Sequence, residues 1–319
     1  MEVMQRTGKK LSIESEFWDD NAGVPFALMV TSRDTSFCLT RKRVIYAITI
    51  RQMANKKIIT IESSDEVELD KHYEIAMDVI RFENLFEGRF YSIKSCKLDD
   101  VELLPDLEKS FLGYMTSNKV MAGFYITFDD KIYKKLFVAF EKYISKRILQ
   151  YHVSLYASYL KGMTADLRMA QLLEVFEPLT VELSKERKIT LRSDPYRTVE
   201  NKCPNCGTKV TRRIRNTGLH LKDMLKAVIK TYGKDIFQGD SVAKIVKKAV
   251  ILRNRIDHVD NQRGALTGPE CGHYLFKFSL LYRIIVMQEI GIPYDYIQGR
   301  VKVLLEDFNK RFQNQRILP

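Results

Sequence analysis

Apolar and polar residues alternate over short runs in the first third of the chain, and many of the apolar residues are β-branched or aromatic. This pattern predicts strands at residues 26–32, 36–40, 44–52 and 57–63. From Asp70 to Phe86 the apolar residues instead recur at three- and four-residue steps, which predicts a helix. Strand-like alternation returns at residues 87–98. Residues 1–127 are therefore expected to form a small β-rich N-terminal domain with one or two helices.

From Phe128 onwards the apolar spacing is typical of helices. Pro178 predicts a kink in one of them, and Ser241 is suited to cap the start of another. The helices are interrupted near residues 200–216 by a segment that carries two cysteines. The expected fold class is therefore α+β, with an all-α helical bundle over residues 128–319 that contains a Cys-rich insertion. The expected helical segments are 131–160, 165–186, 219–233, 241–261, 273–291 and 294–312.

The chain has 319 residues and a formal net charge of +12. This length suits two domains, each with its own core. The positive charge favours polyanionic partners such as RNA, although a dispersed solvated surface accounts for the composition equally well. No apolar run is long enough for a membrane span, and the N-terminus lacks the pattern of a secretory signal. We therefore expect a cytoplasmic protein without a membrane partner.

Five cysteines, an odd number spread unevenly, argue against a disulfide framework. Cys38 and Cys96 lie in apolar strand-like contexts and are expected in the core. The spacing in "CPNC" lets two thiolates grip one metal ion from a tight turn, in which Gly207 can take a positive φ. The segment "GPECGH" offers two further ligands beside a similar turn. The expected ligands of a structural zinc ion are therefore Cys203, Cys206, Cys271 and His273.

Four protein ligands would leave no open position for a metal-bound water, so the zinc would be structural and catalysis would need no cofactor. The alternative is a pair of reduced thiols in a hairpin. Basic residues crowd the cysteine pair and form a patch suited to phosphate contacts, although "RRIR" is also consistent with a solvated face of a hairpin. The expected RNA-contacting residues are Lys209, Arg212, Arg213 and Arg215, with Arg255 from a later helix.

The segment 249–261, "AVILRNRIDHVDN", ends an apolar helical stripe with groups able to handle a proton and an anionic oxygen. Residues four apart stack on one helix face, so Asn254 lies below His258, with Arg253 about 100° around the helix. Metal-independent RNA cleavage needs a base for the 2′-hydroxyl proton, an acid for the leaving oxygen and positive donors on the phosphate. His258 is suited to the proton transfer, Arg253 to the phosphate oxygens and Asn254 to orienting either group.

Chemistry alone leaves two interpretations of this segment open. In the first, it is catalytic, and because one such histidine per chain supplies one proton-transfer group, a twofold homodimer would bring two of these helices together. In the second, His258 complements the dipole at a helix C-terminus while Arg253 pairs with Asp257 on the surface.

Two segments resemble a known family. "LRNRIDH" looks like the HEPN superfamily signature, in which an Arg-Asn pair precedes a histidine, and "ADLRMAQLLEVFEPLTVEL" is similar to the segment that opens the Apea-like HEPN domain. The order of a β-rich region, this Arg/Glu helix, an insertion and the Arg-Asn…His helix also fits. The resemblance covers roughly Phe128 to Phe312. It implies a helical, dimeric domain that binds or cleaves RNA.

Carried over position by position, the resemblance assigns catalysis to Arg253, Asn254 and His258. It assigns Glu177 to holding the arginine from the neighbouring helix, and Arg168 to a structural ion pair. It implies a metal-independent endoribonuclease that cuts RNA, with tRNA as a candidate substrate, leaves a 2′,3′-cyclic phosphate and acts in bacterial anti-phage abortive infection. A phage-derived trigger is an implied partner. The alternative function is a non-catalytic module that binds RNA or a protein.

Overall fold

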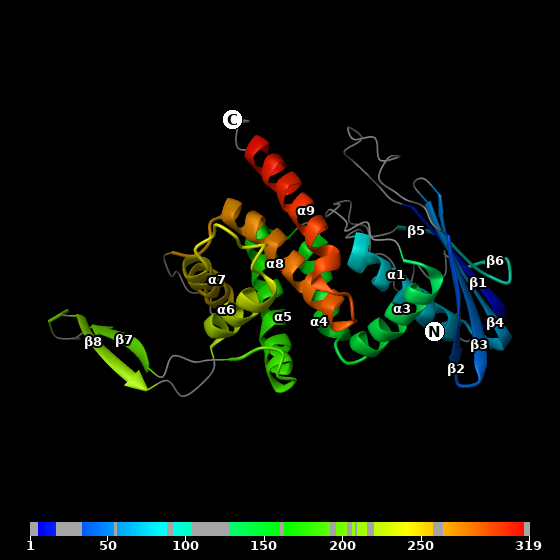
Figure 1. Ribbon diagram of the computed structural model, residues 1–319, viewed down its shortest axis with the longest axis horizontal. Helices are drawn as coiled ribbons and strands as arrows, with labels where there is room; N and C mark the ends of the chain where they lie inside the picture. The colour runs from blue at the N-terminus through cyan, green and yellow to red at the C-terminus, as the bar shows by residue number, and fades with distance from the viewer. Residues whose placement is uncertain are drawn as a thin grey trace. The chain divides into compact units, whose positions relative to one another are not determined.

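The computed structural model in Figure 1 describes residues 6–16, 34–53, 56–87, 92–103, 128–159, 163–191, 196–202, 206–207, 209–215, 220–257 and 264–315. The chain forms two compact units. The first comprises Met1–Tyr151 and Arg283–Pro319, and the second comprises His152–Tyr282. The division expected between residues 127 and 128 falls inside the first unit. The strand expected at residues 26–32 lies outside the described residues.

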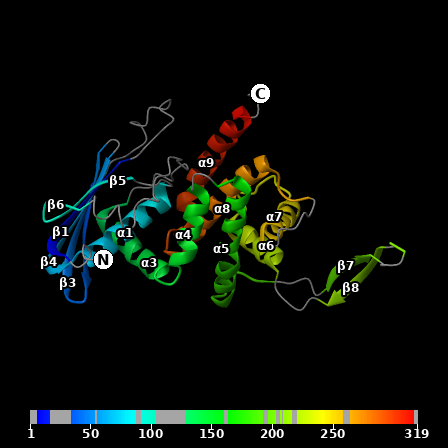
Figure 2. The ribbon, with the colours of Figure 1, turned by 180° about the vertical axis from the view of Figure 1, so that it is seen from behind.

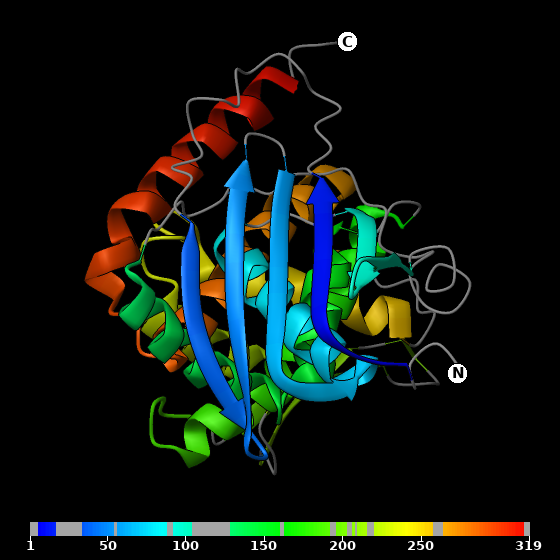
Figure 3. The same ribbon diagram turned by 90° about the vertical axis from the view of Figure 1, so that its right-hand side faces the viewer.

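The first unit contains a six-stranded antiparallel sheet in the order β2-β3-β4-β1-β5-β6 (Figure 3). The expected strands that begin at residues 36, 44, 57 and 87 are confirmed as β2 to β5, whereas β1 was not expected. Within β1, Leu11 and Ile13 alternate with polar residues, and pairing with β4 and β5 buries both completely. The strand bounds are β1 Thr7–Glu16, β2 Thr35–Arg41, β3 Val44–Met53, β4 Lys56–Glu68, β5 Ser92–Leu98 and β6 Val101–Glu102.

Among the described residues, α1 (Leu69–Glu87) and α3 (Asp130–Ile144) cover one face of this sheet, as Figure 1 and Figure 2 show. Their aromatic side chains form the core between helix and sheet. The ring of Phe137 on α3 lies 5.4 Å from that of Phe37 on β2 and 5.6 Å from that of Phe82 on α1. The helix α3, which was expected in the helical domain, therefore belongs to the core of the first unit.

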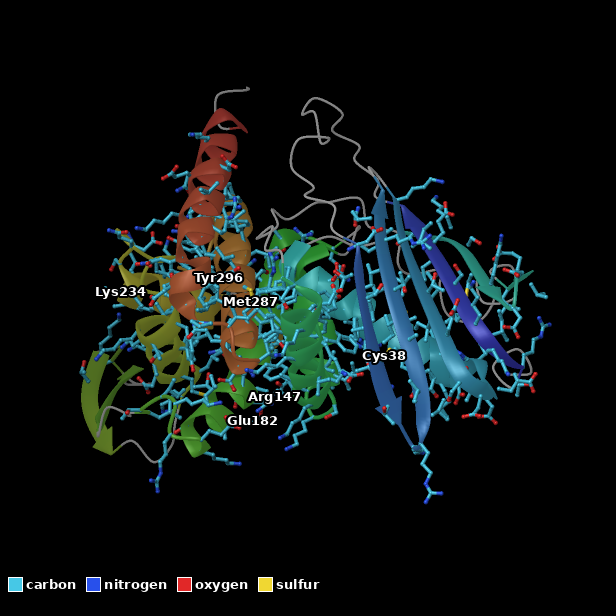
Figure 4. All side chains as sticks on the ribbon, turned by 45° about the vertical axis from the view of Figure 1, so that its right-hand side comes forward. Cys38, Arg147, Glu182, Lys234, Met287 and Tyr296 are labelled. Atoms are coloured by element: carbon cyan, nitrogen blue, oxygen red, sulfur yellow. The ribbon has the colours of Figure 1, made fainter. Side chains whose placement is uncertain are left out.

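The two strand cysteines differ in their burial. Cys96 of β5 is fully buried, as expected, and burial raises the pKa of its thiol to about 12. Cys38 of β2 was also expected in the core, and this prediction is wrong because its side chain is exposed (Figure 4). Its neighbours Phe37 and Leu39 are buried, and successive residues of a strand point to opposite faces. Cys38 therefore lies on the face of the sheet opposite to α1 and α3.

The end of α8 (Gly268–Glu289) and the helix α9 (Tyr294–Gln315) complete the first unit. Arg283 of α8 is 4% exposed and donates from Nε and Nη2 to the backbone carbonyls of Leu85 and Phe86, each at 2.9 Å. These carbonyls belong to the last turn of α1, where the helix leaves its C=O groups without intrahelical donors and a cation complements the dipole. Arg283 therefore ties the C-terminal end of α1 to α8.

A buried histidine makes the stability of the first unit depend on pH. His72 of α1 is completely buried, and its ring lies edge-on to Tyr46 at 5.8 Å between centroids. Burial lowers the pKa of His72, and the neighbouring backbone of Lys9 and Glu68 offsets part of this effect. The unfolded chain, with a histidine pKa of about 6.5, binds the proton more readily than the folded chain. The stability contributed by neutral His72 is therefore present above about pH 6.5 and is lost as the pH falls through the lower folded pKa.

We expect the His72→Phe variant to lose less stability on acidification than the wild type. The measurement is the free energy of unfolding in denaturant at neutral pH and near pH 5, because that interval includes the loss described for His72. His220→Phe is the matched control, since His220 is exposed and its substitution should leave the acid loss unchanged. An equal acid loss in His72→Phe and wild type would assign the effect to another group.

Where the structure describes it, the second unit is helical apart from one hairpin, and α5 continues as one helix across Pro178. Its core includes Phe278, whose ring lies 5.6 Å from that of Phe176 and 5.2 Å from that of Phe237. The hairpin β7–β8 occupies the expected insertion (Figure 2). Among the described residues, no helix is both long and apolar enough to cross a membrane. The bounds are α4 Ile148–Tyr159, which enters from the first unit, α5 Ala165–Lys185, β7 Tyr196–Lys202, β8 Lys209–Arg215, α6 Leu221–Tyr232 and α7 Val242–Asp257.

Candidate active site

The last turn of α7 carries two of the three residues expected to be catalytic, Arg253 and Asn254. Ala249 and Leu252 are buried and fix this end of the helix in the core of the second unit. The side chain of Arg253 is 25% exposed, so it is anchored in the protein and can still be reached from solvent. His258 follows the described end of α7 but lies outside the described residues, so its placement stays a prediction.

Glu174 and Asn254 are among the neighbours that hold the guanidinium of Arg253. Its Nε and Nη2 both donate to the carboxylate of Glu174 on α5, with 3.4 Å between Nη2 and Oε2. Its Nη1 donates to Oδ1 of Asn254 at 3.4 Å. A two-point contact with a carboxylate fixes the plane of a guanidinium as well as its position. Because α5 and α7 pack together, these two helices orient Arg253 without any bound ligand.

The carboxylate that holds Arg253 is not the expected one. Glu177 was assigned this role, but in the structure Glu174 makes the contact and Glu177 is exposed. Residues three apart on a helix differ by about 60° in direction, so the two carboxylates cannot both face the same arginine in the same way. Glu174 is itself exposed, with 44% of its side chain accessible, so no burial of charge in the sequence distinguishes it from Glu177. The buried neighbours of Glu174 are Leu172, Leu173, Val175 and Phe176.

Two further arginines lie on α5 and α7. Arg255 is exposed on α7, and its charge helps to lower the pKa of Asp166, although a hydrogen bond with the Thr164 side chain is the larger cause. Arg255 is thus close to the start of α5. Arg168 on α5 is half-buried, and burial lowers the pKa of its guanidinium. Partial burial is consistent with a structural role for Arg168. Of these two arginines, Arg255 is the one that faces solvent.

The strand β8 carries four of the basic residues that were expected to contact RNA. Lys209 is exposed at the start of β8. The ladder pairs position 212 with 199, 213 with 198 and 215 with 196. RNA contact by this hairpin stays a prediction.

The expected zinc ligands include one residue that does not fit. Cys271 was expected in a turn, but the turn is absent because α8 begins at Gly268 and includes Cys271. Its side chain is fully buried and donates to the carbonyl of Leu266, with 3.7 Å between sulfur and oxygen. Burial, with smaller contributions from Asp166 and Glu270, raises the pKa of the thiol to about 12. Cys271 therefore lies in the core of the second unit and not in a turn, which disfavours it as a zinc ligand.

The other proposed ligands are only partly described. Cys206 is exposed in the turn between β7 and β8, where Gly207 takes the expected positive φ of 70°. Cys203 lies outside the described residues, and His273 is half-buried on α8 beside the ring of Tyr274. Among the described residues, no three His, Cys, Asp or Glu side chains gather in a way that could hold a metal ion. A zinc ion held by Cys203 and Cys206 therefore stays a prediction that needs ligands other than Cys271.

The second unit is thus a helical domain in which α5 and α7 present an oriented arginine beside an asparagine, an arrangement suited to handling a phosphate group. Residues 167–296 match the family described as Apea-like HEPN, so the chain carries an Apea-like HEPN domain and the resemblance of its motifs is confirmed. HEPN domains are often ribonucleases and often bind RNA and dimerise, which indicates a ribonuclease or nucleotide-binding function. No curated protein and no solved structure matches the chain.

Proposed function

We propose that this chain is a metal-independent endoribonuclease of the HEPN type. The observation that carries the proposal is the orientation of Arg253 by Glu174, beside Asn254 and in the turn of α7 that leads directly to His258. A phosphate-binding donor, an orienting amide and a proton-transfer group then lie within six consecutive residues. The membership of residues 167–296 in a family rich in ribonucleases supports the same reaction class.

In the proposed reaction, His258 takes the proton from a ribose 2′-hydroxyl, and the 2′-oxygen attacks the adjacent phosphorus. The bond from phosphorus to the 5′-oxygen of the next nucleotide breaks, and that oxygen leaves with a proton. The products are a 2′,3′-cyclic phosphate and a 5′-hydroxyl. One histidine cannot accept the 2′-hydroxyl proton and donate a proton to the leaving oxygen at the same time. We therefore assign the second transfer to the other copy of the chain, in a homodimer that joins two α7 ends.

Arg253 stabilises the negative charge that grows on the non-bridging phosphate oxygens. Glu174 occupies the Nε and Nη2 edge of the guanidinium, whereas the Nη1 side faces Asn254. The phosphate would approach on the Asn254 side, where the amide can orient either the phosphate or the imidazole of His258. Glu174 thereby acts as a positioning residue in the role first assigned to Glu177.

The test is incubation of the purified chain with total cellular RNA in the presence of EDTA, followed by mapping of the fragment ends. We expect discrete cuts with 2′,3′-cyclic phosphate ends at an initial rate equal to that without EDTA, because no metal ion takes part in the bond-breaking step. Slow loss of activity during long exposure to EDTA would report a structural zinc ion. Immediate loss that returns with added metal would contradict a metal-independent mechanism.

We further propose, on the family resemblance, that the substrate is tRNA and that cleavage serves anti-phage abortive infection after a phage-derived trigger. A protein that stays inactive on total RNA should therefore cut when extract from infected cells is added. Binding of RNA without cleavage under both conditions would instead support the non-catalytic binding module. The charge of +12 supports an RNA partner under either function.

A further inference from the structure

The first unit carries a row of lysines on α3 that the proposed active site does not use. They are the four lysines of the helix and one in the turn that follows it, and all are exposed. We call this row the α3 ridge. Arg147, which Figure 4 labels, comes directly after it and is held over the ring of Tyr143 at 4.5 Å. The ridge comprises Lys131, Lys134, Lys135, Lys142 and Lys146.

The ridge follows from the helical period. At about 100° per residue, the four helical lysines fall within an arc of about 100°. The buried stripe of α3 lies opposite, and it fills the core between helix and sheet with Tyr133, Leu136, Phe137, Phe140, Tyr143 and Ile144. From Lys131 to Lys142 the helix rises about 16 Å. Because α3 packs against the sheet with its apolar side, its lysines face solvent along the length of the helix.

Two of the nearby carboxylates have other partners, and Oδ1 of a third, Asp130, is buried without a hydrogen-bond partner within the described part of the chain. Asp129 caps α3 by accepting a hydrogen bond from the backbone N–H of Ile132 at 2.8 Å. Glu141 is paired with Arg41 of β2. Among the described residues, no carboxylate forms an ion pair with any lysine of the ridge. Lysines elsewhere in the first unit do pair, such as Lys56 with Glu14 at 2.7 Å.

Such a face is unfavourable for the isolated helix. Like charges four residues apart, as at Lys131 and Lys135, destabilise a helix by a few tenths of a kcal/mol per pair, whereas an interleaved Glu would stabilise it by a similar amount. Solubility alone is served better by mixed charges. A polyanion laid along the ridge would relieve this repulsion and would release its own counterions.

We propose that the α3 ridge binds the phosphate backbone of RNA. A rise of about 16 Å lies alongside several phosphates of one strand, given a spacing of about 3.4 Å per phosphate along one strand of duplex DNA. Contacts from lysine ammonium groups to phosphate oxygens do not depend on the base, so the ridge would hold RNA in place without reading its sequence. The ridge thus gives the first unit an RNA-binding surface separate from the residues of the HEPN active site.

An anionic membrane is the competing occupant, and the geometry disfavours it. An interfacial helix inserts its apolar face among the lipids, but the apolar face of α3 is already buried against the sheet. Val138 is the one apolar residue of the ridge arc that is exposed, at 45%. Ile132, beside the arc, is 46% exposed, and two short aliphatic side chains still give little insertion, whereas unpaired lysines suffice for phosphate contacts.

The test measures RNA affinity in the full chain with His258→Ala as background, which keeps the RNA intact. The ridge variant adds Lys131→Gln, Lys135→Gln and Lys142→Gln. The matched control adds Lys97→Gln, Lys302→Gln and Lys310→Gln, which remove the same charge from exposed positions of the first unit outside the ridge. A fluorescent single-stranded RNA of mixed sequence is titrated with each protein at several salt concentrations. Circular dichroism checks that both variants are folded.

We expect the ridge variant to bind RNA about 10-fold more weakly than the control, with the slope of log K against log salt reduced by about 2, because each lost contact accounts for about 0.7 on a single strand. Equal affinity and slope in the two variants would overturn the proposal. Retained RNA affinity with lost binding to phosphatidylserine vesicles would overturn it in favour of a membrane. The choice of RNA rests in part on the proposed function, but binding and cleavage are measured separately, so either can fail alone.

Discussion

The His258→Ala variant is expected to cleave RNA about 1,000-fold more slowly than the wild type, within the range that a general acid or base contributes. Neither neighbour can replace it, because a guanidinium stays protonated at neutral pH and an amide does not titrate. Arg253 and Asn254 remain in place, so the affinity for RNA and the unfolding temperature should not change. The measurements are single-turnover cleavage, RNA binding and thermal unfolding of the same preparation.

His220→Ala serves as the control for removal of an imidazole. His220 is exposed at the start of α6, where its side chain makes no capping hydrogen bond, and cleavage should continue at the wild-type rate. Cleavage by His258→Ala at the wild-type rate would exclude His258 from the mechanism. A loss of RNA affinity as large as the loss of rate would instead identify His258 as a binding residue.

The Glu174→Gln variant is expected to cleave about 10- to 100-fold more slowly, since a misplacement of about 1 Å in a catalytic group can cost about 100-fold. The amide cannot accept at two oxygens from Nε and Nη2, so the guanidinium loses the contact that fixes its plane. The fall should appear in kcat more than in KM, because Arg253 keeps its charge but loses its orientation. Steady-state cleavage of a defined RNA gives both constants.

Glu177→Gln is the matched variant, with the same change of charge on the same helix, three residues away. Glu177 is exposed, and we expect its substitution to leave kcat within about twofold of wild type, as for surface changes that remove no contact. The reverse result, a slow Glu177→Gln and a normal Glu174→Gln, would restore the residue that the family pattern assigned. A faster Glu174→Gln would show that the carboxylate competes with the phosphate for Arg253.

The sequence predicted most helices because their signal is local. Apolar residues at three- and four-residue steps marked the segments that became α5, α6, α7 and α9, and the motif residues Arg253 and Asn254 were placed correctly on α7. The start of α8 was missed although it has a local signal. Thr267 and Glu270 have the spacing of a capping box, and the Thr267 backbone N–H donates to the Glu270 carboxylate at 2.9 Å. Gly268 and Pro269 were interpreted as a turn, whereas proline is tolerated in the first turn of a helix.

Other features depend on which elements meet. The residues around Cys38 in the sequence do not show which face of the strand is covered. Because α1 and α3 pack on the other face of the sheet, Cys38 is exposed. The strand β1 has few apolar residues, so its sequence pattern is weak. It forms a strand because it pairs with β4 on one side and β5 on the other. The burial of Cys271, which was expected in a turn, likewise results from the packing of the first turns of α8.

By itself, the sequence determined the α+β class, the Apea-like HEPN domain and the positions of Arg253, Asn254 and His258 along the chain, because periodicity and motif spacing are properties of neighbouring residues. The tertiary structure decided which carboxylate holds Arg253 and which lysines stand together without partners. Glu174 and Glu177 are three residues apart, and only the rotation of α5 against α7 selects between them. In the same way, the docking of α3 on the sheet determines that its lysines face solvent.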